Sequence, residues 1–180
     1  MDKESLKLGG ILGGIALCVA LLLSVVNSAT ADVIAKRTQA DETAALQVVM
    51  PSAGKFKETK AKGCTAYDAL ADGKHIGWCI KTSSPGYGGD ITVIVGIKDG
   101  KVEGVSITDM DETPGLGARA SEESFISQYK GKSGKLAVSK DGGKIEAISG
   151  ATITSRAVTE AVNKALAAAE KLDGGVENGK

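Results

Sequence analysis

Aromatic residues are scarce in this 180-residue chain, where they make up only 3% of the sequence. A hydrophobic core must therefore be built from Val, Ile, Leu and Ala. Histidine occurs once, as His75, and cysteine three times, so no cluster of Cys and His offers the ligands of a zinc site. An excess of positive charge is also missing, because 22 Lys and Arg balance 22 Asp and Glu. This balance argues against a protein that binds nucleic acid through a basic surface.

Glycine, by contrast, is abundant, with 24 residues in the 180-residue chain against an average usage of roughly 7%. Such a content indicates many turns, or a backbone that approaches a ligand closely. Hydrophobic residues (42%) and charged residues (24%) occur in the proportions of a globular protein. The length allows one ordinary domain with an appendage, but not two full domains.

The amino-terminal segment has the composition of a membrane anchor. No charged residue occurs from Leu8 to Ala31, and the apolar part of this run approaches the roughly 20 residues that a helix needs to span a bilayer. A cleaved signal peptide is the alternative, because Ala29-Thr30-Ala31 fits a cleavage site, but signal cores contain only about 7–15 apolar residues. We therefore predict a short tail and a transmembrane anchor over residues 1–31, with the domain that follows on the extracytoplasmic side.

The rest of the chain predicts an α+β fold, in which a mainly antiparallel sheet is followed by a long carboxy-terminal helix. Residues 32–50 form the expected helical stalk, which ends before Pro51, and residues 51–180 form the expected domain. Alternating or β-branched residues predict strands over 64–70, 75–82, 91–97, 102–108 and 136–139. Residues 83–89 are expected to be irregular.

Helices are predicted at two places in this domain. Ser121 is the expected cap of a short helix over residues 122–129. An apolar stripe without Gly or Pro predicts a long helix over residues 152–172, which Gly174-Gly175 would stop. The stripe itself is interpreted as core packing.

Two Asp-Gly pairs, Asp72-Gly73 and Asp99-Gly100, predict tight hairpin turns. With two-residue loops, Ile97 faces Val102, Ile94 faces Val105, and Cys64 faces Lys81. Cys79 then becomes the diagonal neighbour of Cys64, at a separation of about 7 Å, which is too long for a relaxed disulfide. The sequence leaves open whether these cysteines form a disulfide or remain two free thiols.

One glycine-containing segment leads directly into the last predicted helix. Helix amino termini present unpaired N–H groups and partial positive charge, so a loop of small residues at this position suits a phosphate group. The alternative is that its hydroxyl groups only cap the helix, as Ser and Thr commonly do. The segment consists of Ser149, Gly150, Ala151, Thr152, Ile153, Thr154 and Ser155.

A second segment, Asp111 to Gly117, combines Pro114 with two glycines, Gly115 and Gly117. Proline fixes one φ angle and glycine adopts positive φ, so Leu116 is presented on a stiff, exposed loop. Such an apolar group suits contact with a partner or a flat ligand. The alternative is an ordinary turn.

Taken together, Glu112-Thr113-Pro114-Gly115-Leu116-Gly117 and Ser149-Gly150-Ala151-Thr152 resemble the FMN-binding domain of redox-driven ion pumps. The chain is similar to the G subunits of Rnf complexes, whose relatives are the C subunits of sodium-translocating NADH:quinone reductases. This resemblance implies FMN joined through its phosphate to the Thr152 hydroxyl, in a phosphoester that a separate flavin transferase makes from FAD. The residues themselves offer no nucleophile–base pair for catalysis and no cluster of metal ligands.

The resemblance also implies which residues surround the flavin. Thr113 and Leu116 are the candidates for contact with the ring, and Gly88 and Gly89 would let the backbone approach it. The full set of expected cofactor-binding residues is Thr152 as the covalent site, with Ser149, Gly150, Ala151, Ile153, Thr154, Ser155, Glu112, Thr113, Gly115, Leu116, Gly88 and Gly89.

The function implied is that of a membrane-anchored flavoprotein, which relays electrons within a ferredoxin:NAD ion-translocating oxidoreductase complex. Its partners would be the other membrane subunits and, during maturation, the flavin transferase, with no nucleic acid. The alternatives are the C subunit of a quinone reductase, a stand-alone anchored flavoprotein, or a binding module that has lost its flavin. The sequence does not indicate whether the coupling ion is sodium or a proton.

Overall fold

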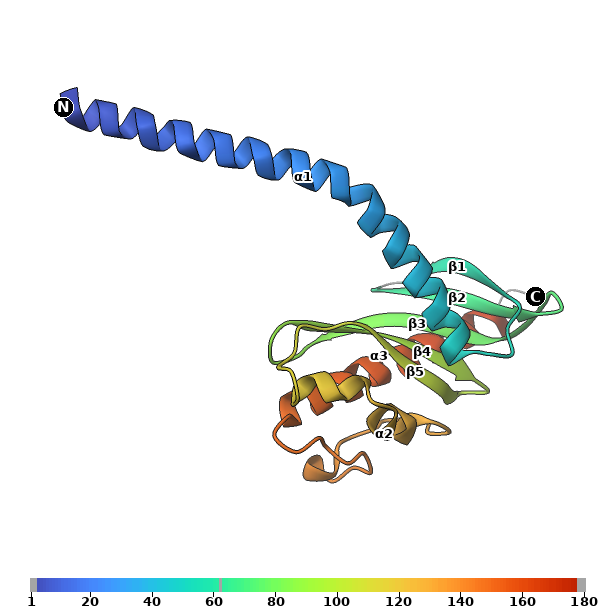
Figure 1. Cartoon of the computed structure of the whole chain (residues 1–180). Coiled ribbons are helices and arrows are strands. Elements are labelled where there is room, and N and C mark those ends of the chain that lie inside the picture. The colour runs from blue at the N-terminus through green and yellow to red at the C-terminus, as the bar shows by residue number, and fades with distance from the viewer. Residues whose placement is uncertain (1–2, 62, 178–180) are drawn as a thin grey trace. The chain divides into compact units, whose positions relative to one another are not determined.

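The computed structural model describes residues 3–61 and 63–177, and the chain divides into two compact units, Met1–Asp41 and Glu42–Lys180 (Figure 1). Helix α1 spans Lys3–Val49 and supplies all the described residues of the first unit. Within it, Lys7–Ala31 is a stretch of 25 residues, long and apolar enough to cross a membrane, and it contains an 18-residue window with a mean hydropathy of 2.5. The predicted helices over the anchor and the stalk are thus confirmed as parts of one helix.

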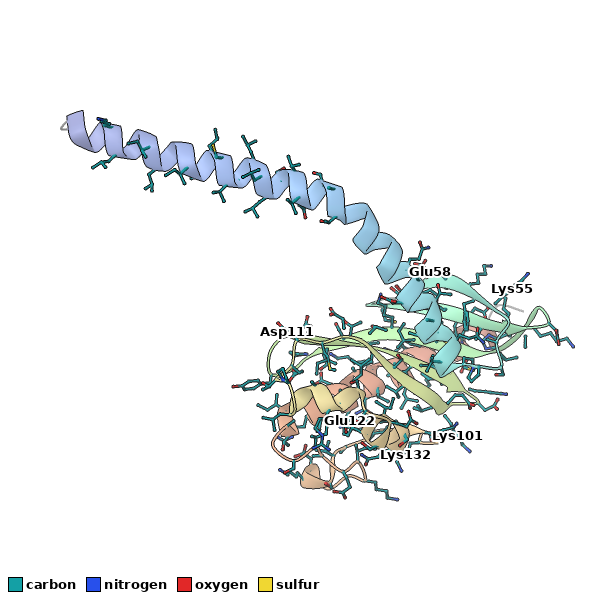
Figure 2. All side chains as sticks on the ribbon, in the orientation of Figure 1. Lys55, Glu58, Lys101, Asp111, Glu122 and Lys132 are labelled. Atoms are coloured by element: carbon teal, nitrogen blue, oxygen red, sulfur yellow. The ribbon has the colours of Figure 1, made fainter. Side chains whose placement is uncertain are left out.

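The second unit contains a five-stranded antiparallel sheet in the order β1-β2-β3-β4-β5. Its strands are β1 (Lys55–Ala61), β2 (Cys64–Ala71), β3 (Lys74–Pro85), β4 (Asp90–Lys98) and β5 (Lys101–Asp109). Four of them were predicted. β1 was not, because its sequence KFKETKA is dominated by charge; Lys55 and Glu58 mark this edge strand in Figure 2. The prediction that residues 83–89 are all irregular is wrong at residues 83–85, which pair with β4.

Both predicted tight turns form, with positive φ at Asp72, Gly73, Asp99 and Gly100. The registers differ from those that two-residue loops alone would give. Ile97 does face Val102, but an irregularity beside Gly96 makes Val95, and not Ile94, the partner of Val105. A β-bulge adds one residue to one strand, so every pairing beyond it shifts by one.

A similar shift separates the two cysteines of the domain. Between Ala69 and Leu70 the register changes, so Lys81 faces Thr65 and not Cys64. Cys79 now lies in one core cluster, while Cys64 packs against the other. Both thiols are free, and burial raises the pKa of Cys79 to about 12.

Helix α3 (Thr152–Glu177) covers one face of the sheet, as Figure 1 shows. The predicted stripe is confirmed as core, since Val158, Val162 and Ala165 are fully buried against β-strand residues such as Val93 and Val95. The predicted stop at Gly174-Gly175 is wrong, because the helix continues through them. A glycine inside a helix costs only about 1 kcal/mol relative to Ala, and so does not by itself end it.

Short helices connect β5 to α3. They are η1 (Gly117–Ser121), α2 (Glu123–Ile126), η2 (Ser127–Tyr129) and η3 (Ser139–Asp141). The helix expected over 122–129 is thus split between α2 and η2. The predicted cap is wrong, because Ser121 Oγ donates to the Ala118 carbonyl at 3.1 Å. The strand expected over 136–139 is a single bridge between Val138 and Ile145.

The outer edge of β5 is partly covered by the segment after η2. Val102 N donates to the Lys132 carbonyl at 2.9 Å, and Gly131 N donates to the Val102 carbonyl at 2.7 Å. Figure 2 shows Lys101 and Lys132 close to each other at this edge. Such pairing removes free backbone groups that would otherwise attract another strand.

The end of α1 packs on the opposite face of the sheet, within the second unit. Val49 and Met50 are fully buried there against residues that include Ala69, Cys79 and Ile94. Gly96 makes the close approach possible, since a Cβ at this position would lie 2.2 Å from the Val49 carbonyl oxygen. The sheet is therefore covered on both faces, by α3 and by the last turns of α1.

Candidate functional site

The site is held together by the carboxylate of Glu112, which connects three segments that are distant in sequence. Glu112 Oε1 accepts hydrogen bonds from Tyr87 N at 2.7 Å and Gly88 N at 3.3 Å. Its Oε2 accepts a hydrogen bond from Thr154 Oγ1 at 2.7 Å. Because Glu112 is only 8% exposed, these donors replace the water that its charge has lost. The loop 86–89, the loop 111–117 and the first turn of α3 are thereby fixed to one another.

Glycines make room for this arrangement. A Cβ at Gly117 would lie 2.4 Å from Glu112 Oε2 and 2.9 Å from Thr154 Oγ1. A Cβ at Gly88 would lie 1.8 Å from the Asp111 carbonyl oxygen. At Gly88 the absence of a side chain thus serves the contact between two loops of the protein. At Gly89 the corresponding Cβ would reach only an ordinary 3.9 Å contact with Asp111.

The three hydroxyl groups of the α3 amino terminus have different environments. Thr154 is 1% exposed and donates to Glu112. Ser155 is fully buried, where its Oγ accepts from Ile148 N at 3.0 Å and donates to the Ala151 carbonyl at 2.9 Å. Thr152 is the one hydroxyl residue of the three that solvent reaches. Thr154 and Ser155, which were also among the expected cofactor-binding residues, are therefore committed to internal hydrogen bonds.

A lysine that sequence reasoning missed contacts Thr152. Lys140, in η3, places its Nζ 2.9 Å from Thr152 Oγ1 and donates to it. Next to it, Asp141 binds Arg156 of α3 through two hydrogen bonds of 2.6 and 2.7 Å. These hydrogen bonds hold the pKa of the Asp141 carboxyl below its usual value. Nothing in the sequence pointed to Lys140, because it lies 12 residues before Thr152 in a connecting loop.

Apolar side chains surround the site and face solvent. Tyr87 is 71% exposed, Leu116 44% and Ile153 51%, and each comes from one of the three segments that Glu112 joins. Leu116 lies over Gly150, whose φ is +79° and whose Cβ would be 3.1 Å from Leu116 Cδ2. The prediction that Leu116 is presented on an exposed loop is confirmed.

The remaining predicted residues lie on the same loops. Thr113 is exposed, and its carbonyl accepts from Leu116 N at 3.1 Å, which closes the turn around Gly115. Gly115 adopts the expected positive φ of 75°. Ser149 is exposed, whereas Ala151 is buried under the start of α3. The structure thus brings the two predicted motifs together.

Known protein families match both the amino-terminal segment and the domain of this chain. Residues 86–167 match the FMN-binding domain family, and residues 1–49 match the RnfG N-terminal region. The chain is 34% identical to the G subunit of the Na(+)-translocating ferredoxin:NAD(+) oxidoreductase complex of Acetobacterium woodii, with 94% of each chain covered. It is 37% identical to the G subunit of the proton-translocating ferredoxin:NAD(+) oxidoreductase complex of Clostridium ljungdahlii, with 86% of each covered. The chain belongs to the RnfG family.

Among solved structures, this RnfG-family chain resembles the C subunit of the Na(+)-translocating NADH-quinone reductase of Parabacteroides distasonis. That similarity has a TM-score of 0.49 and 27% identity, and covers 57% of this chain and 59% of the other. The preference between the two alternatives rests on the two relatives matched over most of their length, which are named as G subunits of ferredoxin:NAD(+) complexes, and on the match to the RnfG N-terminal region. The RnfG interpretation is therefore the better of the two alternatives.

The FMN-binding domain of this RnfG-family chain includes all three segments of the site. Its residues fit the cofactor in two respects. Thr152 offers a hydroxyl that solvent reaches, beside a lysine that would face a phosphate. Tyr87, Leu116 and Ile153 offer exposed apolar surface of the kind that a flat aromatic ring covers.

A groove of about 630 Å³ lies elsewhere, beside the carboxy-terminal half of α3. Asn163, Leu166 and Asp173 are among its lining residues. As the structure describes it, neither Ser nor Thr lines this groove, so it offers no hydroxyl for a phosphoester. It is also separated from Thr152 by three turns of helix or more, at 3.6 residues per turn.

Proposed function

We propose that this chain carries FMN as a phosphoester on Thr152 and relays electrons within a membrane-bound ferredoxin:NAD oxidoreductase complex that translocates ions. The relatives from Acetobacterium woodii and Clostridium ljungdahlii support the complex, because each is named as the G subunit of such an oxidoreductase. The FMN-binding domain match over residues 86–167 supports the cofactor.

The single observation that supports Thr152 as the attachment residue is the contrast among the three hydroxyl groups. Thr154 and Ser155 are buried and hydrogen-bonded inside the domain, whereas Thr152 is partly exposed. A phosphoester must extend from the protein surface, since its other end carries a ribityl chain and a three-ring system. Of the three, Thr154 and Ser155 would each give up a hydrogen bond that the hydroxyl proton donates inside the domain, whereas Thr152 Oγ1 lies at the surface and accepts from Lys140.

Each element of the site would have its own task in the loaded protein. Bound FMN supplies the reversible electron transfer, and the protein contributes position and electrostatics. The N–H groups at the start of α3 face the phosphate charge. Leu116, with Tyr87 and Ile153, gives the ring an apolar surface and excludes water from one of its faces.

We further infer that the domain lies outside the cytoplasm and that α1 anchors it among other membrane subunits. A covalent bond suits a compartment in which a cofactor that dissociates is lost. A flavin transferase would load the domain from FAD. The side chains of the apolar stretch Lys7–Ala31 are exposed, and this surface suits contact with other spans.

The test is expression of the full chain with a flavin transferase, followed by denaturation, gel electrophoresis and detection of flavin fluorescence in the band. Thr152→Ala, Thr154→Ala and Ser155→Ala are compared with the wild type. We expect fluorescence in the wild type and in the Thr154 and Ser155 variants, and none in Thr152→Ala. Tandem mass spectrometry of the peptide then locates the modified residue.

Two results would contradict the proposal. A dark wild-type band, in a reaction where the transferase modifies a control protein, would favour a binding module that has lost its flavin. A fluorescent Thr152→Ala band would move the bond to another hydroxyl. Purification of the tagged chain from its own membranes distinguishes two further possibilities. A subunit of a complex would co-purify with other membrane proteins, whereas a stand-alone flavoprotein would not.

A further inference from the structure

We propose that Lys140 is the cation that pairs with the flavin phosphate at Thr152 and accelerates its attachment. This inference rests on the proposed function, since it concerns the same hydroxyl group. The observation behind it is the 2.9 Å hydrogen bond from Lys140 Nζ to Thr152 Oγ1, the atom that would bond to phosphorus. Any phosphate oxygen on that atom comes within reach of the same ammonium group.

The neighbourhood of Lys140 leaves its charge available. Within the part of the chain that the structure describes, Lys140 takes part in no ion pair, and its side chain is exposed. The adjacent carboxylate, Asp141, is instead occupied by a two-point ion pair with Arg156, one turn into α3 from Thr152. This ion pair neutralises the charge of Arg156 and fixes η3 to helix α3. Lys140 therefore stays beside Thr152 with an uncompensated positive charge.

The positive charge of Lys140 can stabilise the negative charge that the attachment reaction places on the phosphate. In the transfer, the bond from Thr152 Oγ1 to the FMN phosphorus forms, and the pyrophosphate bond of FAD to its AMP half breaks. AMP leaves, and the hydroxyl proton passes to AMP or to water, so no oxidant or reductant is needed. Negative charge gathers on the phosphate oxygens during this exchange, and the phosphodiester product keeps one negative charge. A lysine held next to the attacking oxygen stabilises both states.

The contribution has a defined size and salt dependence. A charge-assisted hydrogen bond at a solvent-exposed position is weakened by water and by dissolved ions. We expect Lys140→Gln to slow flavin attachment by roughly tenfold at low ionic strength. The ratio of wild-type to variant rate should fall toward one as salt is added, because screening removes the advantage of the charge.

The experiment measures the rate of attachment on the full chain in mild detergent, prepared without flavin and then mixed with FAD and a purified flavin transferase. In-gel fluorescence and the intact mass of the chain follow the modified fraction with time. The variants are Lys140→Gln, Lys140→Arg and a matched control, Lys144→Gln, which removes the same charge from an exposed lysine four residues along the same connection. Thr152→Ala runs beside them.

The expected result is slow attachment in Lys140→Gln, near wild-type attachment in Lys140→Arg, and no change in Lys144→Gln. Equal attachment rates for Lys140→Gln and the wild type would overturn the inference about Lys140. The proposed function would still stand in that case, provided that the flavin is attached at Thr152. If flavin attachment is equally slow in Lys140→Gln and Lys140→Arg at every salt concentration, the inference is also overturned. That result would indicate that the lysine side chain acts through packing and not through its charge. If Thr152→Ala is still modified, the proposed function fails, whichever result Lys140 gives.

Discussion

Glu112 Oε2 accepts a 2.7 Å hydrogen bond from Thr154 Oγ1, and this contact joins residues 42 positions apart in the chain. Through it, the loop that presents Leu116 is fixed to the helix that begins at Thr152. Because the carboxylate also binds Tyr87 N and Gly88 N, a third loop is held in the same arrangement. The geometry of the site therefore depends on one buried side chain that faces the protein.

Replacement of Glu112 should lower the stability of the domain. In Glu112→Gln the amide NH₂ group cannot accept, so at least one of the donors loses its acceptor. We expect a loss of about 1–3 kcal/mol in the free energy of unfolding. Urea titration of the full chain in mild detergent measures this, with the fluorescence of the single tryptophan, Trp78, which is 6% exposed in the core.

Glu122→Gln is the matched control for that measurement. It removes the same charge, but Glu122 pairs with Arg119 at 3.3 Å on the surface, where both side chains are about half exposed. Its effect should stay below about 0.5 kcal/mol. Equal losses in the two variants would contradict a special role for the buried carboxylate.

The close contact between Gly96 and Val49 gives a second prediction. A Cβ at position 96 would lie 2.2 Å from the Val49 carbonyl oxygen, so Gly96→Ala must push the end of α1 away from the sheet. Overpacking of this kind costs about 1–3 kcal/mol. In Gly54→Ala, by comparison, the new Cβ would lie at an ordinary 3.9 Å from its nearest neighbour. The same urea titration should show a clear loss in the free energy of unfolding for Gly96→Ala but not for Gly54→Ala. Similar curves for the two variants would argue against close packing of Val49 on Gly96.

The sequence predicted those elements whose local signals agree with their tertiary setting. The Asp99-Gly100 turn formed because both residues tolerate positive φ, and α3 formed because its apolar stripe has helical spacing. The registers were predicted less well, because a bulge beside Gly96 leaves no mark in composition. β1 was missed for a related reason, since an edge strand with charged side chains lacks the alternation that identifies a buried one.

The site was predicted in its loops but not in its contacts. Pro and Gly marked the loop around Leu116, and small residues marked the segment before Thr152. The sequence did not indicate that Glu112 turns inward, or that Lys140 reaches Thr152, since both contacts join segments that only the fold brings together. The resemblance indicated Thr152, but residue types alone did not separate it from Ser155, and the structure adds the difference in burial and in internal hydrogen bonds.

Glu42 gives the domain a pH-dependent contribution to stability. Burial raises the pKa of this carboxyl, but hydrogen bonds from Tyr67 and Lys81 outweigh it and hold the pKa below the ordinary 4.5. A depressed folded-state pKa stabilises the protein above the unfolded-state pKa, and this contribution is lost as the pH falls through the folded value.

The comparison of wild type with Glu42→Gln isolates this effect, because glutamine keeps the shape and does not titrate. The wild type should be more stable at pH 7, and the difference should shrink once the pH drops below about 4.5. Glu160→Gln, at a surface pair with Lys164, should show a small difference at every pH. A wild-type advantage that grows toward acid would show that the sign of this assignment is wrong.

Leu116 offers a test of where the flavin ring lies, separate from where the phosphate is attached. The side chain is 44% exposed in a stiff loop, so Leu116→Ala should change the free energy of unfolding by less than about 0.5 kcal/mol. If the ring covers Leu116, however, its loss exposes the flavin, and iodide should quench the flavin fluorescence more strongly. Attachment at Thr152 should remain, since the hydrogen bond to its hydroxyl comes from Lys140, which this change leaves in place.

Val48→Ala is the matched change at an apolar side chain outside the site, where Val48 is 67% exposed on α1. It should leave iodide quenching at the wild-type level. Equal quenching in wild type and Leu116→Ala would place the ring elsewhere, and Tyr87→Ala and Ile153→Ala would then be compared in the same way. An exposed apolar residue is ordinary when it stands alone, but Tyr87, Leu116 and Ile153 lie on two loops and a helix turn that one carboxylate joins, which is the pattern of a binding surface. The quenching series identifies which of the three the ring touches.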